Sequence, residues 1–248
     1  MKKLIMATVA ALSLHVPVTQ AAIVTFNYTG QIGFTYQYFW GANAHIEYPS
    51  TFVIGGTTLT IGDTFHGQFS YDTSTRLTPV SEYDWTTNSY KPSTTQFAGA
   101  APRNAATLIF DNKTYVYRAP NNGADSGSTL TVFDNNQYLN DYFQHRTELN
   151  DQGLQSALSL TFANANDKTV LNGPIAPSSL TQKDFPRSFI DFSYRAPNSP
   201  YSFEILGDIN TFKQVAAPVP EPETYAMMLA GLALVGWAAR RRRNQPAN

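Results

Sequence analysis

The sequence predicts an all-β protein: an antiparallel β-sandwich or jelly-roll-like single domain, followed by a C-terminal transmembrane helix. Two features of the composition favour strands in the body of the chain. Aromatic residues make up 13% of the sequence and charged residues only 14%, and the helix formers Glu and Lys are scarce beside Thr, Ser, Asn and Gly. The third observation is that apolar residues recur at every second position, which is typical of half-buried strands.

The alternating segments are short, and clusters of Gly, Asn and Pro separate them, as expected for strands joined by turns. The alternating residues are Val24, Phe26 and Tyr28; Phe65, Phe69 and Tyr71; Leu158, Leu160 and Phe162; Ile190, Phe192 and Tyr194; and Phe203 and Ile205. The stretch 134–150 is the one place in the body where we expect a short helix. Segments 28–34 and 206–212 resemble each other, which suggests that the first and last strands lie side by side.

Composition also excludes several classes of function. The chain has no cysteine, so it has no disulfide, no cysteine zinc site and no thiol nucleophile. The predicted body, residues 22–217, holds 11 basic and 16 acidic residues, a net charge of 11 − 16 = −5. An acidic body argues against a nucleic-acid partner, which needs a basic face.

The N-terminus predicts export. Residues 1–21 combine Lys2 and Lys3 with a short apolar stretch and end on small residues, the pattern of a secretory signal peptide. We expect signal peptidase to cleave between Ala21 and Ala22.

The C-terminus predicts a membrane anchor. Residues 224–239 form an uncharged run, which as a helix is about 24 Å long, somewhat shorter than the hydrocarbon core of a bilayer. Arg240, Arg241, Arg242 and Arg243 follow it and should stop transfer and stay cytoplasmic. The body should therefore lie in the periplasm while this helix holds it to the inner membrane.

The tail also resembles a known sorting signal. Val219, Pro220, Glu221 and Pro222, the short apolar helix and the terminal arginines, over residues 218–243, are similar to the PEP-CTERM signal of Gram-negative bacteria. That resemblance implies a partner exosortase that removes the tail, and delivery to the cell surface or to the exopolysaccharide matrix of a biofilm. An ordinary anchor with a Pro-rich stem is the alternative. The run 61–74 is similar to a strand of secreted β-rich proteins that carry this tail, a likeness that implies no activity.

No motif of catalysis occurs in the body. His45, His66 and His145 show no zinc-protease spacing, and the segment 123–127 lacks the order of a nucleophile elbow. We therefore expect no catalytic residue, no metal site and no enzymatic activity.

Calcium is the one cofactor that the sequence leaves open; otherwise we expect none. Asp134, Asn135, Asn136 and Asp141 are rich in oxygen ligands. Tyr138 and Leu139 break the EF-hand pattern, however, and an Asx-rich turn explains the same residues.

Aromatic residues are the strongest remaining signal in the body. Tyr36, Phe39 and the candidate glycan-stacking residues Tyr38 and Trp40 form one cluster, and Tyr83 and Trp85 form a second. Sugar rings stack their C–H edges on aromatic faces while polar neighbours hold the hydroxyls. The alternative is that these rings belong to the core.

Three functions follow from these observations. The first is a non-catalytic surface or extracellular-matrix protein that binds glycans such as exopolysaccharide. The second is a glycosidase-like, polysaccharide-active enzyme, which needs two carboxyl groups about 5 to 9.5 Å apart. The third is a purely structural exported protein. A structure should separate them, because an acid pair in a groove favours the enzyme, an aromatic strip favours the binder, and neither feature favours the structural role.

Overall fold

The structure is a computed structural model that describes residues 23–215 except 41–42, 85, 102, 112–115, 120–126, 137–139, 165, 167–169 and 172. Several sequence predictions lie outside the described residues. These are the signal peptide with its cleavage site at Ala21 and Ala22, Trp85, and the segment 218–243 with its proline motif, apolar helix and arginines. Within the described part of the chain, no helix has the length and apolar character needed to cross a membrane.

Every regular element of the described residues is a β-strand, which confirms the predicted all-β class. The strands are β1 (Ile23–Phe39), β2 (His45–Glu47), β3 (Thr51–Ile54), β4 (Thr57–Thr60), β5 (Thr64–Asp72), β6 (Thr78–Asp84), β7 (Ser89–Ala100), β8 (Ala105–Phe110), β9 (Val116–Ala119), β10 (Ser128–Asn136), β11 (Asn140–Asp151), β12 (Leu154–Asn164), β13 (Arg187–Arg195) and β14 (Tyr201–Gln214).

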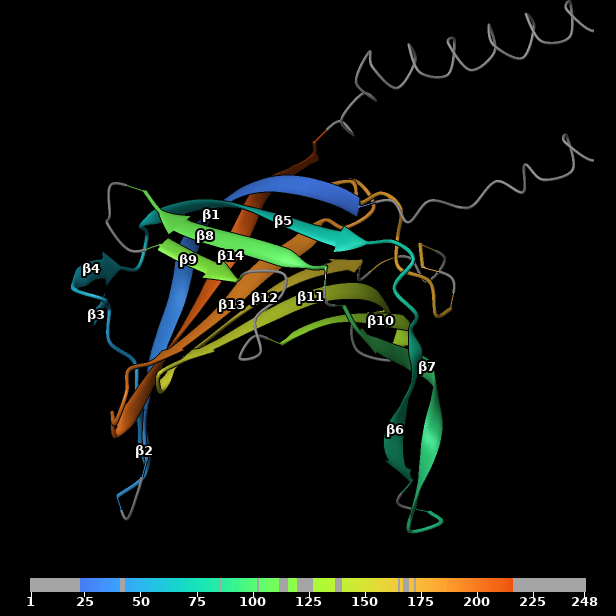
Figure 1. Ribbon diagram of the computed structural model, residues 1–248, viewed down its shortest axis with the longest axis horizontal. Coiled ribbons are helices and arrows are strands. Elements are labelled where there is room, and N and C mark those ends of the chain that lie inside the picture. Colours follow the sequence, from blue (N-terminus) through green and yellow to red (C-terminus); the bar gives the residue numbers. More distant parts are fainter. Residues whose placement is uncertain are drawn as a thin grey trace, which may run out of the picture. The chain divides into compact units, whose positions relative to one another are not determined.

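Twelve of these strands form one antiparallel sheet, so the predicted sandwich or jelly roll is not confirmed. The strand order is β6-β7-β10-β11-β12-β13-β14-β1-β5-β8-β9, with β2 added beside β1, and β3 and β4 form a separate hairpin. The sheet folds over, so that β5, β8 and β9 lie above β11, β12 and β13 (Figure 1). Alternation in a sequence shows which residues face inward, but it does not show whether two facing layers belong to one sheet or to two.

The core fills the space between the two halves of the folded sheet. The rings of Phe69 and Phe162 lie 5.1 Å apart, and those of Tyr71 and Phe143 lie 4.9 Å apart. The alternation in the sequence is largely confirmed. Tyr194 and Phe203 are only partly buried, packed against the core, whereas the other predicted inward-facing residues are buried: Val24, Phe26, Tyr28, Phe65, Phe69, Tyr71, Leu158, Leu160, Phe162, Ile190, Phe192 and Ile205.

The prediction that the first and last strands are neighbours is also confirmed. β1 pairs with β14, and the register places Tyr28 opposite Phe212 and Phe34 opposite Leu206. The backbone amide of Val215 still donates to the carbonyl of Thr25 at 2.8 Å. The described chain therefore begins and ends at the same end of this strand pair.

A bulge at Gly33 reverses the outward face of β1. Ile32 pairs with Gly207 and Phe34 with Leu206, which leaves Gly33 as an extra residue. Ile32 is buried in the core, whereas Phe34 is 43% exposed. Because an extra residue shifts the alternation by one, the even-numbered residues of β1 point inward before the bulge and outward after it.

A glycine permits the close packing of β1 on β5. A Cβ at Gly67 would lie 2.1 Å from the carbonyl oxygen of Thr107 and 2.5 Å from the hydroxyl of Tyr28. That hydroxyl donates to the same carbonyl at 2.6 Å. Gly67 thus leaves the room in which a buried tyrosine satisfies its hydrogen bond.

One histidine lies wholly inside the core. His145 is fully buried against Phe69 and Tyr71, and its Nε2 lies 3.1 Å from the carbonyl oxygen of Ser70. Burial lowers its pKa to about 4, because the low-dielectric interior disfavours the charged imidazolium. His145 is therefore neutral in the folded protein near neutral pH.

The short helix expected within 134–150 is wrong, because β10 and β11 occupy this stretch. Asp141, Phe143, His145 and Thr147 are all buried, with more exposed residues between them. The polar character of these residues hides the period of two in the sequence, since one inward-facing position is a histidine and two others are an aspartate and a threonine.

Candidate functional site

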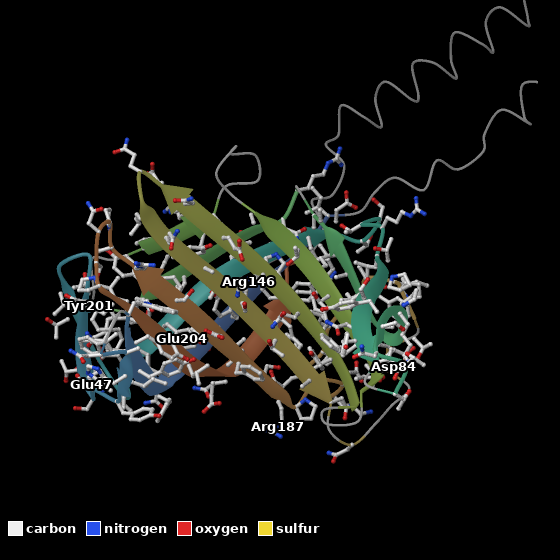
Figure 2. All side chains as sticks on the ribbon, turned by 90° about the horizontal axis from the view of Figure 1, so that it is seen from below. Glu47, Asp84, Arg146, Arg187, Tyr201 and Glu204 are labelled. Carbon is white, nitrogen blue, oxygen red and sulfur yellow. The ribbon has the colours of Figure 1, made fainter. Side chains whose placement is uncertain are left out.

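The outer face of β11, β12, β13, β14 and β1 carries the candidate site. Figure 2 shows this face, with Arg146 and Glu204 near its centre. Elements project beside it on two sides: β2 with the adjoining ends of β1 and β14 on one, and the β6–β7 hairpin on the other (Figure 1). The antiparallel register brings together side chains that are far apart in the chain, since Arg146 lies opposite Ser159 and Ser159 lies opposite Asp191.

Small side chains form the floor of this face. They are Ala157 and Ser159 of β12, Ser193 of β13 and Ser202 of β14. Longer side chains stand on both sides, from β11 on one side and from β1 on the other. This difference in side-chain length hollows out an otherwise continuous sheet surface.

The β1 side consists of four aromatic residues, Phe34, Tyr36, Tyr38 and Trp40, which we call the aromatic ladder. Their ring centroids follow one another at 6.1, 5.0 and 6.1 Å. Trp40 at one end is 58% exposed, and its indole nitrogen donates to the hydroxyl of Ser202 at 3.4 Å. The ladder thus presents aromatic surface to solvent along the edge of the floor.

The β11 side is polar and charged. The Nε of Arg146 donates to Glu148 at 2.8 Å, and its Nη1 donates to the hydroxyl of Ser159 at 3.0 Å. Asn150 lies further along the same strand and pairs with Gln155 of β12. This side therefore offers fixed hydrogen-bonding groups opposite the aromatic ladder.

A groove of about 670 Å³ lies between Trp40, at one end of the ladder, and the β11 side. Its lining includes Trp40, Arg146, Glu148, Asn150, Gln155 and Arg195. Aromatic surface with a few placed polar groups is the usual chemistry of a small-molecule or saccharide site.

An acid pair lies beside the groove. Asp191 of β13 and Glu204 of β14 are hydrogen-bonded to each other, and Tyr36 is hydrogen-bonded to Glu204. Burial, followed by the negative charge of Glu204 and the hydrogen bond to it, raises the pKa of Asp191 to about 7 against the opposing effect of Arg146. Burial and Glu204 also raise the pKa of Tyr36. Asp191 therefore holds a proton over much of the range below neutral pH.

The structure does not bring the two predicted aromatic clusters together. Tyr38 and Trp40 lie on the groove side, whereas Tyr83 lies on β6, where its ring contacts that of Tyr90 at 5.1 Å. Figure 2 labels Tyr201 and Asp84, which mark the two clusters, at opposite sides of the face.

The carboxylates considered for calcium accept hydrogen bonds from a loop. Asp141 is buried and accepts a hydrogen bond from the backbone amide of Leu171 at 2.9 Å, and Asp134 accepts one from Gly173 at 2.8 Å. Across the part of the chain that the structure describes, no three His, Cys, Asp or Glu side chains gather as metal ligands would. His45 stacks on Phe39 at 4.3 Å, and His66 pairs with Asp111.

Sequence reasoning missed the polar half of this site. Arg146, Glu148, Asp191 and Glu204 come from three strands and meet only through the sheet register. No local motif marks them, and the stretch that contains Arg146 and Glu148 was expected to include a helix. The alternation of outward polar residues along β11 is the only local signal that could have found two of them.

The fold and the C-terminal segment define a class of protein: an all-β domain with an export tail. A family model of the PEP-CTERM protein-sorting motif matches residues 218–243. The protein therefore carries this sorting signal, which implies export, transient sorting at the membrane and processing by an exosortase. No curated protein and no solved structure matches the chain.

Proposed function

We propose that this protein is a non-catalytic component of the cell surface or extracellular matrix, and that its β-sheet domain binds polysaccharide in the groove beside Trp40. The observation that carries the proposal is the exposed indole of Trp40 facing the ion-paired Arg146 and Glu148 across a floor of small side chains. A sugar ring can lay its C–H face on the indole while its hydroxyls reach the polar side.

The proposed route to the surface uses both ends of the chain. The signal peptide starts translocation, the apolar helix 224–239 holds the protein in the inner membrane with its body in the periplasm, and exosortase then releases it near Pro220–Pro222. Val215 lies at the end of β14 that pairs with the start of β1, whereas Trp40 follows the other end of β1. The last described residue thus lies at the end of β14 away from Trp40.

The glycosidase alternative meets a geometric difficulty. The acid pair on this face, Asp191 and Glu204, is hydrogen-bonded, and its carboxyl groups are therefore much closer than the roughly 5 Å that even a retaining glycosidase needs. No room remains between them for a sugar carbon or an attacking water. A purely structural role would leave the groove without a ligand.

Binding to the host's own exopolysaccharide tests the proposal. Trp40→Ala should weaken binding about tenfold, the equivalent of roughly 1.4 kcal/mol, which is a typical size for one aromatic contact. Tyr90→Ala is the matched control, because Tyr90 is 74% exposed but lies on the β6–β7 hairpin. Equal binding by wild type and Trp40→Ala would refute the role of the groove, and sustained release of reducing ends would refute the non-catalytic reading.

A further inference from the structure

The aromatic ladder has two exposed stacking surfaces, one at each end. Trp40 is 58% exposed at the groove end. At the other end, Phe34 is 43% exposed and Tyr48 is 64% exposed, and their rings lie 5.5 Å apart. The hydroxyl of Thr35 donates to the carbonyl of Pro49, which fixes the segment that carries Tyr48. Two separate platforms could therefore each stack one sugar ring.

The middle of the ladder is polar. The rings of Tyr36 and Tyr38 meet at 87°, so they cannot form one flat surface. Tyr36 is hydrogen-bonded to Glu204 and to Tyr38. This central part offers hydroxyl and carboxyl groups to the hydroxyls of a ligand that passes over it.

The two platforms are far enough apart to span several sugar rings. From Phe34 to Phe39 the pairing of β1 with β14 runs without a register shift, so this part of the strand is regular. Trp40 lies six positions after Phe34 along the strand, and the ring centroids of the ladder follow one another at 6.1, 5.0 and 6.1 Å. The rings of Phe34 and Trp40 are therefore at most about 17 Å apart, the length of about three sugar units. A monosaccharide can reach only one of them.

The charges on this face favour an uncharged ligand. Arg146 is paired with Glu148, and Asp191 is hydrogen-bonded to Glu204, while Arg195 lies at the groove rim. Two arginines thus stand with two glutamates and an aspartate whose pKa is raised to about 7, and neither sign dominates. A polyanion would meet the carboxyl groups of Glu148 and Glu204, and Arg146 already pairs with Glu148, so the face offers a polyanion little net attraction.

We propose that this face binds a stretch, several units long, of a linear, uncharged polysaccharide, with one sugar ring on Trp40 and another further along the chain on Phe34 and Tyr48. The inference rests on the proposed function and specifies its ligand. Charge balance selects a neutral polymer, and the separation of the platforms selects a long one.

Titration of the full-length protein, in a detergent without sugar headgroups, tests this inference. The probes are neutral gluco-, manno- and xylo-oligosaccharides from the disaccharide to the octasaccharide, with oligogalacturonides of the same lengths as the acidic counterpart. We expect at least one neutral series to bind with an affinity that rises with length and levels off once both platforms are reached. Oligogalacturonides should bind at least tenfold more weakly.

Variants at the two platforms separate the inference from the proposed function. Phe34→Ala should weaken binding of the longest neutral oligomer about tenfold and leave the shortest unchanged, whereas Trp40→Ala should weaken both. Phe34→Tyr keeps the ring and should retain affinity, which controls for misfolding. Trp40-dependent binding that does not change with length, or that prefers the acidic series, would overturn this inference alone. Failure of every saccharide to bind would overturn the proposed function as well.

Discussion

Acid should destabilise this protein through His145, and the effect can be calculated. Burial lowers the pKa of His145 from 6.5 to about 4. The unfolded chain therefore takes up a proton as the pH falls through 6.5, and the folded protein does not until about pH 4. Stability is lost over that window, by about 2 kcal/mol at pH 5 and about 3 kcal/mol once both states are protonated.

Two substitutions isolate this effect. His145→Gln keeps a donor for the carbonyl of Ser70 but does not titrate, and His145→Phe keeps a ring beside Phe69 and Tyr71. Each variant has its own stability cost at pH 7.5, which is constant with pH. The free energy of unfolding of each variant, relative to wild type, should therefore be about 2 kcal/mol higher at pH 5 than at pH 7.5.

The assay is urea unfolding of wild type and both variants between pH 7.5 and 4.5, followed by circular dichroism. Subtracting the variant from the wild type at each pH cancels the contributions of the other titrating groups, provided that they are independent of His145. A difference that stays constant from pH 7.5 to 5 would show that His145 titrates normally, and the description of a dry core around it would then be wrong.

Three further predictions test other parts of the structure. The pKa of Asp191 is raised in the folded protein, so its ionisation lowers stability as the pH rises from about 4 to 7. Asp191→Asn should therefore raise the melting temperature more at pH 8 than at pH 5. An equal change at both pH values would refute the raised pKa of Asp191. Gly67→Ala should cost about 1–3 kcal/mol through its clash with Tyr28, whereas Gly33→Ala, whose added Cβ meets nothing closer than 3.6 Å, should cost much less, as thermal unfolding will show. Replacing Pro220–Pro222 with three alanines should leave insertion intact and block processing, so that blots show full-tail protein in the membrane fraction; tail-bearing wild-type protein at the surface would contradict this.

More of the fold than of the site could be predicted from the sequence. The inward-facing residues were predictable because alternation at Val24, Phe26 and Tyr28 is local and the hydrophobic effect acts on each position separately. That β1 and β14 lie side by side was predictable because segments 28–34 and 206–212 resemble each other. β10 and β11 were partly missed because Asp141, His145 and Thr147 occupy inward positions that usually hold apolar side chains.

The site, too, was only partly predictable from the sequence. Tyr38 and Trp40 were recognised as candidates because aromatic density is visible in the sequence, but their exposure was not predictable. Strict alternation from Tyr28 would have placed both on the core side. The bulge at Gly33 moves Tyr38 and Trp40 to the outer face, and a glycine in a strand does not by itself predict a bulge.

The sequence by itself determined that this protein carries an export-sorting signal and that its fold is all-β. The sorting signal is a contiguous segment, and the strand pattern is a repeat over a few residues, so both depend only on neighbours in the chain. The tertiary structure decided that the strands form one folded sheet, that the aromatic ladder faces solvent, and that Arg146, Asp191 and Glu204 lie on the same face. These features depend on the register of hydrogen bonds between strands that are tens of residues apart, and no short stretch of sequence encodes that register.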